Sequence, residues 1–251
     1  MGHQFQRARR AEDKERRRQV ILAAGRELLE QTGELNITVA DVAARAGLGK
    51  ATVFLYFPTK EALNLELLGK LLGEWFDDLD RELEKPGRLT AASLVRMLAD
   101  SIAERGLLVR LTATASLLER HVEVEQVVRF KTELLARLAQ SGAHVERRLK
   151  LPAGEGARLF LRLNALIVGL YQACDLGPVA REAMSRPELW PLRLDFEAEL
   201  HNLLAALLRG LLCAPQSRRK GQTRNEKEGL PCLSPPPKSR VRLRAPAARR
   251  R

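Results

Sequence analysis

Three side chains that can donate hydrogen bonds, Lys50, Thr52 and Tyr56, lie within one short stretch of this 251-residue chain. Ammonium and hydroxyl groups of this kind bind phosphate oxygens, and a lysine can also reach acceptor atoms on a base edge. The small residues Gly49 and Ala51 allow the backbone to approach a phosphate strand closely. The chemistry that these residues offer is the binding of nucleic acid. The alternative is an ordinary helical hairpin with a solvated face.

The stretch 38–57 that must position these groups has the pattern of two short helices joined by a tight turn. Thr38 and Asp41 stand three residues apart, as in a capping box at a helix start. Gly47 supplies the backbone freedom that ends a helix, and Pro58 disfavours helical geometry at the residue before it. The spacing therefore predicts a helix–turn–helix motif.

This motif, with the amphipathic helix before it, resembles the DNA-binding domain of the TetR family of bacterial transcription regulators. The resemblance spans residues 15–75 and is carried by Thr38, Val42, Ala43, Ala46-Gly47-Leu48, Thr52, Tyr56-Phe57, Pro58 and Lys60-Glu61-Ala62-Leu63. The chain departs from the usual family pattern at Gly49, Ala51, Phe54 and Leu55. Because Phe54 and Leu55 cannot donate hydrogen bonds, we expect sequence recognition to depend more on methyl contacts, DNA shape and half-site spacing.

The resemblance implies an all-α protein with two helical domains. An N-terminal three-helix helix–turn–helix domain binds DNA, and a C-terminal helical domain binds a ligand and dimerises. The expected divisions are a basic arm at 1–14, the DNA-binding domain at 15–75, the regulatory domain at 76–213 and a basic Pro/Arg-rich disordered tail at 214–251. The implied DNA contacts are Thr38, Gly49, Lys50, Ala51, Thr52, Phe54, Leu55, Tyr56 and Lys60.

Composition independently favours helices, because Leu, Ala, Arg and Glu dominate and β-branched runs are scarce. Outside the motif, apolar periodicity predicts helices at 11–31, 59–84, 89–104, 106–119, 122–150, 155–175 and 192–212. No window approaches the roughly 18 apolar residues of a membrane span, and the Arg-rich start is unlike a secretory signal. With three widely spaced cysteines, the chain is expected to be cytoplasmic, and associated with the nucleoid when bound to DNA.

The formal net charge of +12 is unevenly distributed along the chain. Residues 214–251 carry a net charge of +10 and residues 1–18 carry +4, so residues 19–213 are slightly acidic, at −2. Basic termini of this kind attract DNA without regard to sequence, in a manner that salt weakens. The alternative is that they form solvated charge runs that aid solubility alone.

Two stretches near the C-terminus, LFLRLNALIVGL at 159–170 and LHNLLAALLRGLL at 200–212, carry apolar residues on more than one face. They are either central core helices or helices that pack against a second copy of the chain. The resemblance implies a four-helix dimer interface, which would present two recognition helices to half-sites about 34 Å apart. The interface residues expected are Leu159, Leu163, Leu166, Leu170, Leu200, Leu204, Leu207 and Leu211.

The resemblance also implies a small-molecule pocket between the DNA-binding domain and this interface. Bulk and position select Trp75, Phe76, Met97, Leu111, Phe130, Phe160 and Tyr171 as lining residues, although each also fits an ordinary core. The scarcity of polar residues there favours an apolar ligand. The expected protein is a dimeric repressor that binds a palindromic operator and is released by that ligand. The alternative is a DNA-binding dimer without a ligand, whose helical domain serves only dimerisation or protein contact.

Residue patterns for catalysis are missing from the sequence. Its histidines, His3, His121, His144 and His201, form no H-E-x-x-H pair and no Cys/His cluster with zinc spacing. No G-x-S-x-G elbow occurs. We therefore expect no enzymatic activity, no cofactor and no bound metal.

Overall fold

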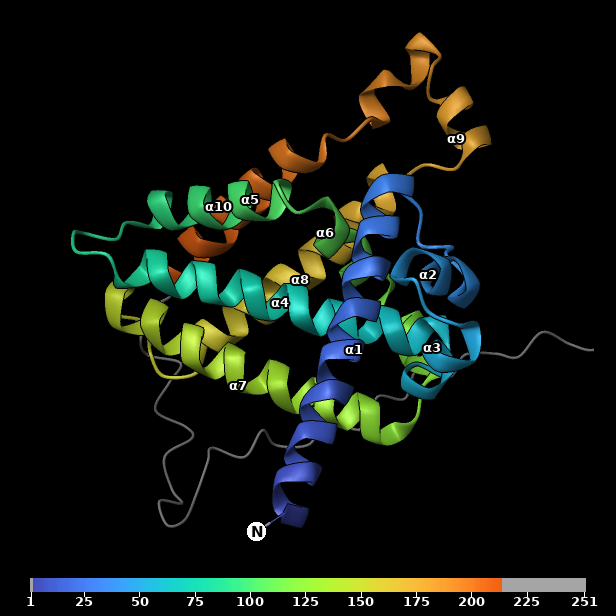
Figure 1. Ribbon diagram of the computed structural model, residues 1–251. Helices are drawn as coiled ribbons and strands as arrows, with labels where there is room; N and C mark the ends of the chain where they lie inside the picture. The colour runs from blue at the N-terminus through green and yellow to red at the C-terminus, as the bar shows by residue number, and fades with distance from the viewer. Residues whose placement is uncertain (1, 214–251) are drawn as a thin grey trace, which may run out of the picture. The chain divides into compact units, whose positions relative to one another are not determined.

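The computed structural model describes residues 2–213, and the regular elements within this range are all helical, as Figure 1 shows. The all-α class is thus confirmed. Within the same range, no helix has the length and apolar character needed to cross a bilayer. The tail at 214–251 lies outside the described residues. The elements are α1 (Gly2–Thr32), α2 (Val39–Ala46), α3 (Lys50–Tyr56), α4 (Lys60–Glu84), α5 (Ala91–Ala103), α6 (Gly106–Leu118), η1 (Glu119–His121), α7 (Val124–Leu149), α8 (Glu155–Cys174), α9 (Pro178–Ala183), η2 (Pro187–Leu192) and α10 (Phe196–Cys213).

Helices α2 and α3 form the predicted helix–turn–helix. The hydroxyl of Thr38 accepts a hydrogen bond from the backbone N–H of Asp41 at 3.2 Å, and the Asp41 carboxylate accepts one from the backbone N–H of Thr38 at 2.9 Å. This reciprocal pair is the predicted capping box, and it satisfies two N–H groups that the helix start leaves unpaired. Gly47 ends α2 with a φ of 66°, which glycine adopts without a steric penalty.

Helix α4 connects the helix–turn–helix unit to the later helices. Thr59 caps its start by accepting a hydrogen bond from the backbone N–H of Ala62 at 3.0 Å. Over 25 residues, α4 packs against α1, α6 and α7, and its buried apolar side chains extend from Ala62 to Leu83. The length predicted from the sequence is therefore confirmed. The buried residues of α1–α4 and those of the later helices form one continuous core. A movement of α4 would therefore displace side chains both in the helix–turn–helix unit and in the later helices.

The later helices pack around a close crossing of α7 and α8. A Cβ atom added at Gly142 of α7 would lie 2.6 Å from the backbone nitrogen of Ala157, so only glycine fits. Gly156 of α8 faces Gly142 at the same crossing. Helix α6 packs against α4 and α8, while α10 packs against α5 and α8. The buried side chains of these helices complete the core.

Two parts of the fold differ from the sequence predictions. Helix α1 begins at Gly2 rather than near residue 11, and most of the added residues are Arg, Gln or Ala, which have good helix propensity. The stretch after α8 contains α9 and η2, neither of which was predicted. Each starts with a proline in its first turn, a position that tolerates the missing N–H. Both elements are too short to show an apolar period.

Candidate nucleic-acid interface

Helix α3 has one buried side and one open side. Val53 and the residue that follows the helix, Phe57, are completely buried and anchor it to the core. On the open side, Lys50, Ala51, Phe54 and Leu55 are exposed. Leu55 is 82% exposed, which is unusual for a large apolar side chain and leaves its methyl groups free for contact. Four of the six sequence-predicted contact residues of α3 are thus exposed on its open side.

Lys50 and Phe54 interact across one turn of α3. The Lys50 ammonium lies 5.6 Å from the centre of the Phe54 ring, within the range of a cation–π contact. Gly49 precedes them as the N-cap residue, with no side chain to obstruct an approaching strand. Phe54 cannot read a base by hydrogen bonding, but it limits where the Lys50 charge points.

The side chains of four other predicted contact residues are less accessible to DNA, because they are hydrogen-bonded within the protein or half-buried. The Thr38 hydroxyl donates to the Asp41 carboxylate at 2.7 Å in addition to its capping bond, so it is committed to the capping box. The Lys60 ammonium donates to Asn36 Oδ1 at 2.9 Å and joins the start of α4 to the loop before α2. Thr52 and Tyr56 are half-buried, and Tyr56 packs against the core. Their roles in DNA contact remain predictions.

Helix α1 braces the motif through polar contacts that sequence reasoning missed. The Arg18 guanidinium forms a two-bond ion pair with the Glu66 carboxylate of α4 and lies 4.8 Å from the centre of the Phe57 ring. Arg45 of α2 donates to Gln31 of α1 at 2.6 Å. Arg18 and Glu66 are 48 residues apart, and in sequence each resembles a solvated surface charge. No local signal could have paired them.

Arg110 of α6 connects the later helices to the end of α1. Its guanidinium donates to the carbonyl oxygen of Gly33 at 2.9 Å and to that of Leu29 at 3.2 Å. Carbonyls in the last turn of a helix have no partner within the helix, and the negative end of the helix dipole favours a cation there. The bridge fixes the end of α1 just before the chain enters α2.

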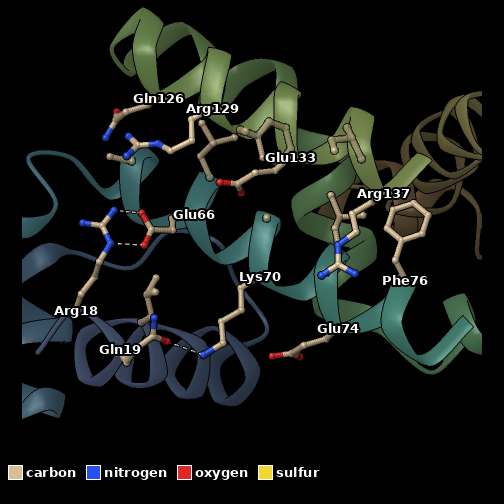
Figure 2. A pocket seen from close by; sticks show the side chains of 18 of the residues that line it. Arg18, Gln19, Glu66, Lys70, Glu74, Phe76, Gln126, Arg129, Glu133 and Arg137 are labelled. Atoms are coloured by element: carbon tan, nitrogen blue, oxygen red, sulfur yellow. Dashed lines mark hydrogen bonds and ion pairs between the residues drawn. The ribbon is translucent and has the colours of Figure 1, made fainter. Parts of the chain in front are cut away.

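A groove of about 880 Å³ lies between α1, α4 and α7. Figure 2 shows its polar character, with Arg18 paired to Glu66 and Lys70 reaching Gln19, while Arg129 and Glu133 extend from α7. Acidic and basic side chains share its walls with apolar ones such as Phe76, Phe130 and Leu134, so it suits a molecule with both polar and apolar parts. The labelled side chains are Arg18, Gln19, Glu66, Lys70, Glu74, Phe76, Gln126, Arg129, Glu133 and Arg137.

Of the predicted pocket residues, Phe76 and Phe130 line this groove. Trp75, Phe76 and Phe160 pack against one another, with ring centroids 4.7–6.0 Å apart. The Trp75 indole N–H donates to Ser101 Oγ at 3.0 Å. This aromatic cluster is buried and filled by its own side chains.

The remaining pocket residues lie elsewhere in the fold. Leu111 is fully buried, and Met97 and Tyr171 are half-buried against the core. Burial and the nearby Asp175 carboxylate raise the pKa of Tyr171 to about 12, so its hydroxyl stays protonated at neutral pH. The seven predicted residues therefore do not converge on one cavity. A ligand site built from them remains a prediction.

The predicted interface leucines fall into two groups. Leu159, Leu163, Leu170, Leu200 and Leu204 are buried within the single chain. A side chain with almost no exposed area has none to bury against a second copy, so the assignment of these five is corrected to the core. Leu166, Leu207 and Leu211 keep exposed area. Leu161, Leu203 and Leu212, which were not among the predicted interface residues, are also exposed on the same two helices.

A capped, braced helix pair with an exposed second helix and a lysine on its open face defines a helix–turn–helix protein. A family model described as "Bacterial regulatory proteins, tetR family" matches residues 21–67. Another, described as "Tetracyclin repressor-like, C-terminal domain", matches residues 70–215. The chain therefore belongs to the TetR family of transcription regulators, which bind DNA through this motif, and it is not an enzyme.

Individual relatives agree with this assignment. The chain is 28% identical over 173 residues to the HTH-type transcriptional regulator BetI of Rhizobium meliloti, covering 66% of this chain and 83% of that protein. It is 30% identical over 174 residues to BetI of Brucella anthropi, covering 68% of this chain and 87% of that protein. It is 41% identical over 54 residues to the HTH-type transcriptional regulator EthR of Mycobacterium tuberculosis, covering 22% of this chain and 25% of EthR.

Proposed function

We propose that the protein is a dimeric repressor in which the α3 helices of two subunits bind the half-sites of a palindromic operator. The observation that carries the proposal is the exposed face of α3, with Lys50 in its first turn and Val53 anchored in the core. A single seven-residue helix contacts few base pairs, so a second copy is needed for useful affinity and specificity. Repression is favoured by the repressor-like description of the matching C-terminal domain.

Each proposed function is assigned to one of the domains expected from the sequence. Residues 15–75 bind DNA, and residues 76–213 regulate and dimerise. The basic residues of 1–14 and 214–251 add attraction to phosphate that weakens with salt. If the tail contributes, deleting 214–251 should lower the salt dependence of DNA affinity, and an unchanged slope would show that it is passive. A DNA-bound regulator of this kind is expected in the cytoplasm, at the nucleoid.

Dimerisation is assigned to the outward faces of α8 and α10. Leu166, Leu207 and Leu211 retain partial exposure on these helices, which also carry the more exposed Leu161 and Leu203. Apolar side chains that line neighbouring helices without a cover within the chain are typical of an interface between copies.

Release by a small effector is the second part of the proposal. The groove between α1, α4 and α7, lined by charged and apolar side chains, favours an effector that carries polar groups over the purely apolar one expected from the sequence. An effector can shift DNA binding only by its different affinity for the bound and free conformations. The filled cluster of Trp75, Phe76 and Phe160 supports the other candidate, a dimer without an effector. A thermal-shift screen of polar and apolar small molecules separates the two, because only an effector site gives a saturable increase in melting temperature.

The DNA-binding proposal is tested by selecting bound duplexes from a random pool. A two-fold dimer predicts an inverted repeat whose half-sites are about one helical turn apart, centre to centre. Recovery of a single asymmetric site would contradict the dimeric arrangement. Recovery of no enriched sequence would contradict sequence-specific regulation.

A further inference from the structure

Between α8 and α10 the chain forms a projecting segment, residues 177–195, which we call the α9–η2 arm. It contains α9 and η2, and Figure 1 shows it, in orange, extending beyond the ends of α8 and α10. The dimer contacts proposed on α8 and α10 do not include this segment.

The arm is folded by its own hydrogen bonds. The Arg193 guanidinium donates to the carbonyl oxygen of Met184 at 2.8 Å and lies 5.7 Å from the centre of the Trp190 ring. The Trp190 indole N–H donates to the carbonyl oxygen of Ser185 at 3.4 Å, and Arg181 donates to the carbonyl oxygen of Leu176 at 2.8 Å. These contacts close the arm on itself, so it presents a defined surface.

That surface is unusually apolar. Val179 is 82% exposed, Leu192 is 66% exposed and Trp190 is 55% exposed, while the other tryptophan, Trp75, is 4% exposed. Leu194, next to α10, is also exposed. Scattered single apolar residues on a surface are ordinary, but several large ones on one small element mark an interaction site.

Two observations identify the occupant as a second copy of this chain. The arm leads directly from α8 to α10, the helices whose exposed leucines form the proposed interface, so its surface continues theirs along the chain. A standard interface buries about 800 Å² per partner, and the exposed side chains of the arm enlarge the apolar area that α8 and α10 offer to a second copy. In a two-fold dimer each subunit contributes its own arm, so the apolar surfaces of two arms are buried in the interface.

We propose that the α9–η2 arm of each subunit packs against the other subunit and buries Trp190 and Leu192 there. This inference rests on the dimer of the proposed function. It makes the arm, in addition to α8 and α10, a determinant of dimer affinity.

Trp190 provides a direct optical test in the full-length protein. The emission of Trp190 is obtained as the difference between the wild type and Trp190→Phe, which leaves Trp75 unchanged. On dilution, this emission should shift to the red with the midpoint of dimer dissociation measured by sedimentation. A Trp190 emission that does not change across that transition would overturn the proposal.

A matched pair of substitutions tests the energetics. Leu192→Glu places a charge on the arm, and Leu135→Glu makes the same change at a 54% exposed position of α7. Circular dichroism checks that both variants fold. Leu192→Glu should raise the dimer dissociation constant at least tenfold, while Leu135→Glu should leave it near the wild-type value. Equal values for Leu192→Glu and the wild type would overturn the role of the arm.

Leu203→Glu on α10 distinguishes an error in the proposed role of the arm from an error in the proposed dimer. If Leu203→Glu dissociates the dimer and Leu192→Glu does not, the dimer stands and the arm inference fails. If the wild type is monomeric at every concentration, the dimer of the proposed function fails together with the arm.

Discussion

Lys50 lies in the first turn of α3 with its ammonium group held beside the Phe54 ring. We expect it to contact a phosphate, because the neighbouring exposed residues Ala51 and Leu55 carry no charge that could compete for it. Lys50→Ala should weaken binding to every DNA sequence and lower the slope of log affinity against log salt by about 1 per half-site. Fluorescence anisotropy at several salt concentrations measures this slope.

The control for Lys50 is Lys85→Ala, which removes an exposed lysine just beyond the far end of α4. It should leave the slope unchanged. A wild-type slope for Lys50→Ala would show that Lys50 does not contact phosphate. Loss of discrimination at one base position would assign it to a base edge instead.

Asp41 makes the stability of the motif depend on pH. Hydrogen bonds from the side chain and the backbone of Thr38 hold the pKa of the Asp41 carboxyl below its ordinary value of 3.8. A carboxyl with a lower pKa in the folded state stabilises that state above its unfolded pKa and loses the contribution as pH falls through the folded pKa.

Asp41→Asn should therefore lower the melting temperature at neutral pH, and the difference from the wild type should shrink as pH falls below 3.8. Thermal unfolding between about pH 7 and pH 3 measures it. A difference that stays constant across this range would show that the carboxylate charge does not contribute.

At the scale of elements, the crossing of α7 and α8 depends on two glycines. Gly142→Ala would place its Cβ atom 2.6 Å from the backbone nitrogen of Ala157, so the helices must separate. Overpacking of this kind costs about 1–3 kcal/mol or more of unfolding free energy. Chemical denaturation measures it.

Gly169→Ala is the matched control for the crossing, since Gly169 lies in α8 with nothing within 4 Å of its added Cβ. It should stabilise the protein by up to about 1 kcal/mol because alanine favours the helix. Equal effects of the two substitutions would contradict the close crossing.

Arg110 couples α6 to the end of α1 through two carbonyl oxygens. Arg110→Ala should leave these carbonyls without their charged partner, at a cost of about 1.5–3 kcal/mol. It should also speed amide hydrogen exchange at the end of α1 and in α2. The exposed Arg96 of α5 is the control, and Arg96→Ala should change neither measurement. If Arg110→Ala leaves the amide hydrogen exchange of α1 and α2 unchanged, Arg110 does not couple α6 to the end of α1.

The helix–turn–helix could be predicted from sequence because its signals are local. Thr38, Asp41, Gly47 and Pro58 each act within a few residues of the chain, and the capping box and the helix end follow from them. The pairing of Arg18 with Glu66 joins distant parts of the chain, so nothing local indicated it. Local rules also could not foresee α9 and η2, which have no apolar period.

Burial on α8 and α10 could not be predicted for a different reason. Both helices carry leucine on several faces, so the pattern does not distinguish Leu163, which is buried in the chain, from Leu161, which is exposed. Only the packing of α5, α6 and α7 around them decides which face is covered. The pocket prediction had the same weakness, because bulky aromatic residues such as Trp75 and Phe160 fill a core as readily as they line a cavity.

For the molecule as a whole, the central claim is that two α3 helices of one dimer read two half-sites at the same time. The most direct test inserts five base pairs between the half-sites of the selected operator. This turns one half-site to the opposite face of the DNA, because a helical turn is about 10–10.5 base pairs. Anisotropy titrations of both duplexes with the same protein should show at least a tenfold loss of affinity for the lengthened operator. Equal affinities would contradict the claim that the two helices act together.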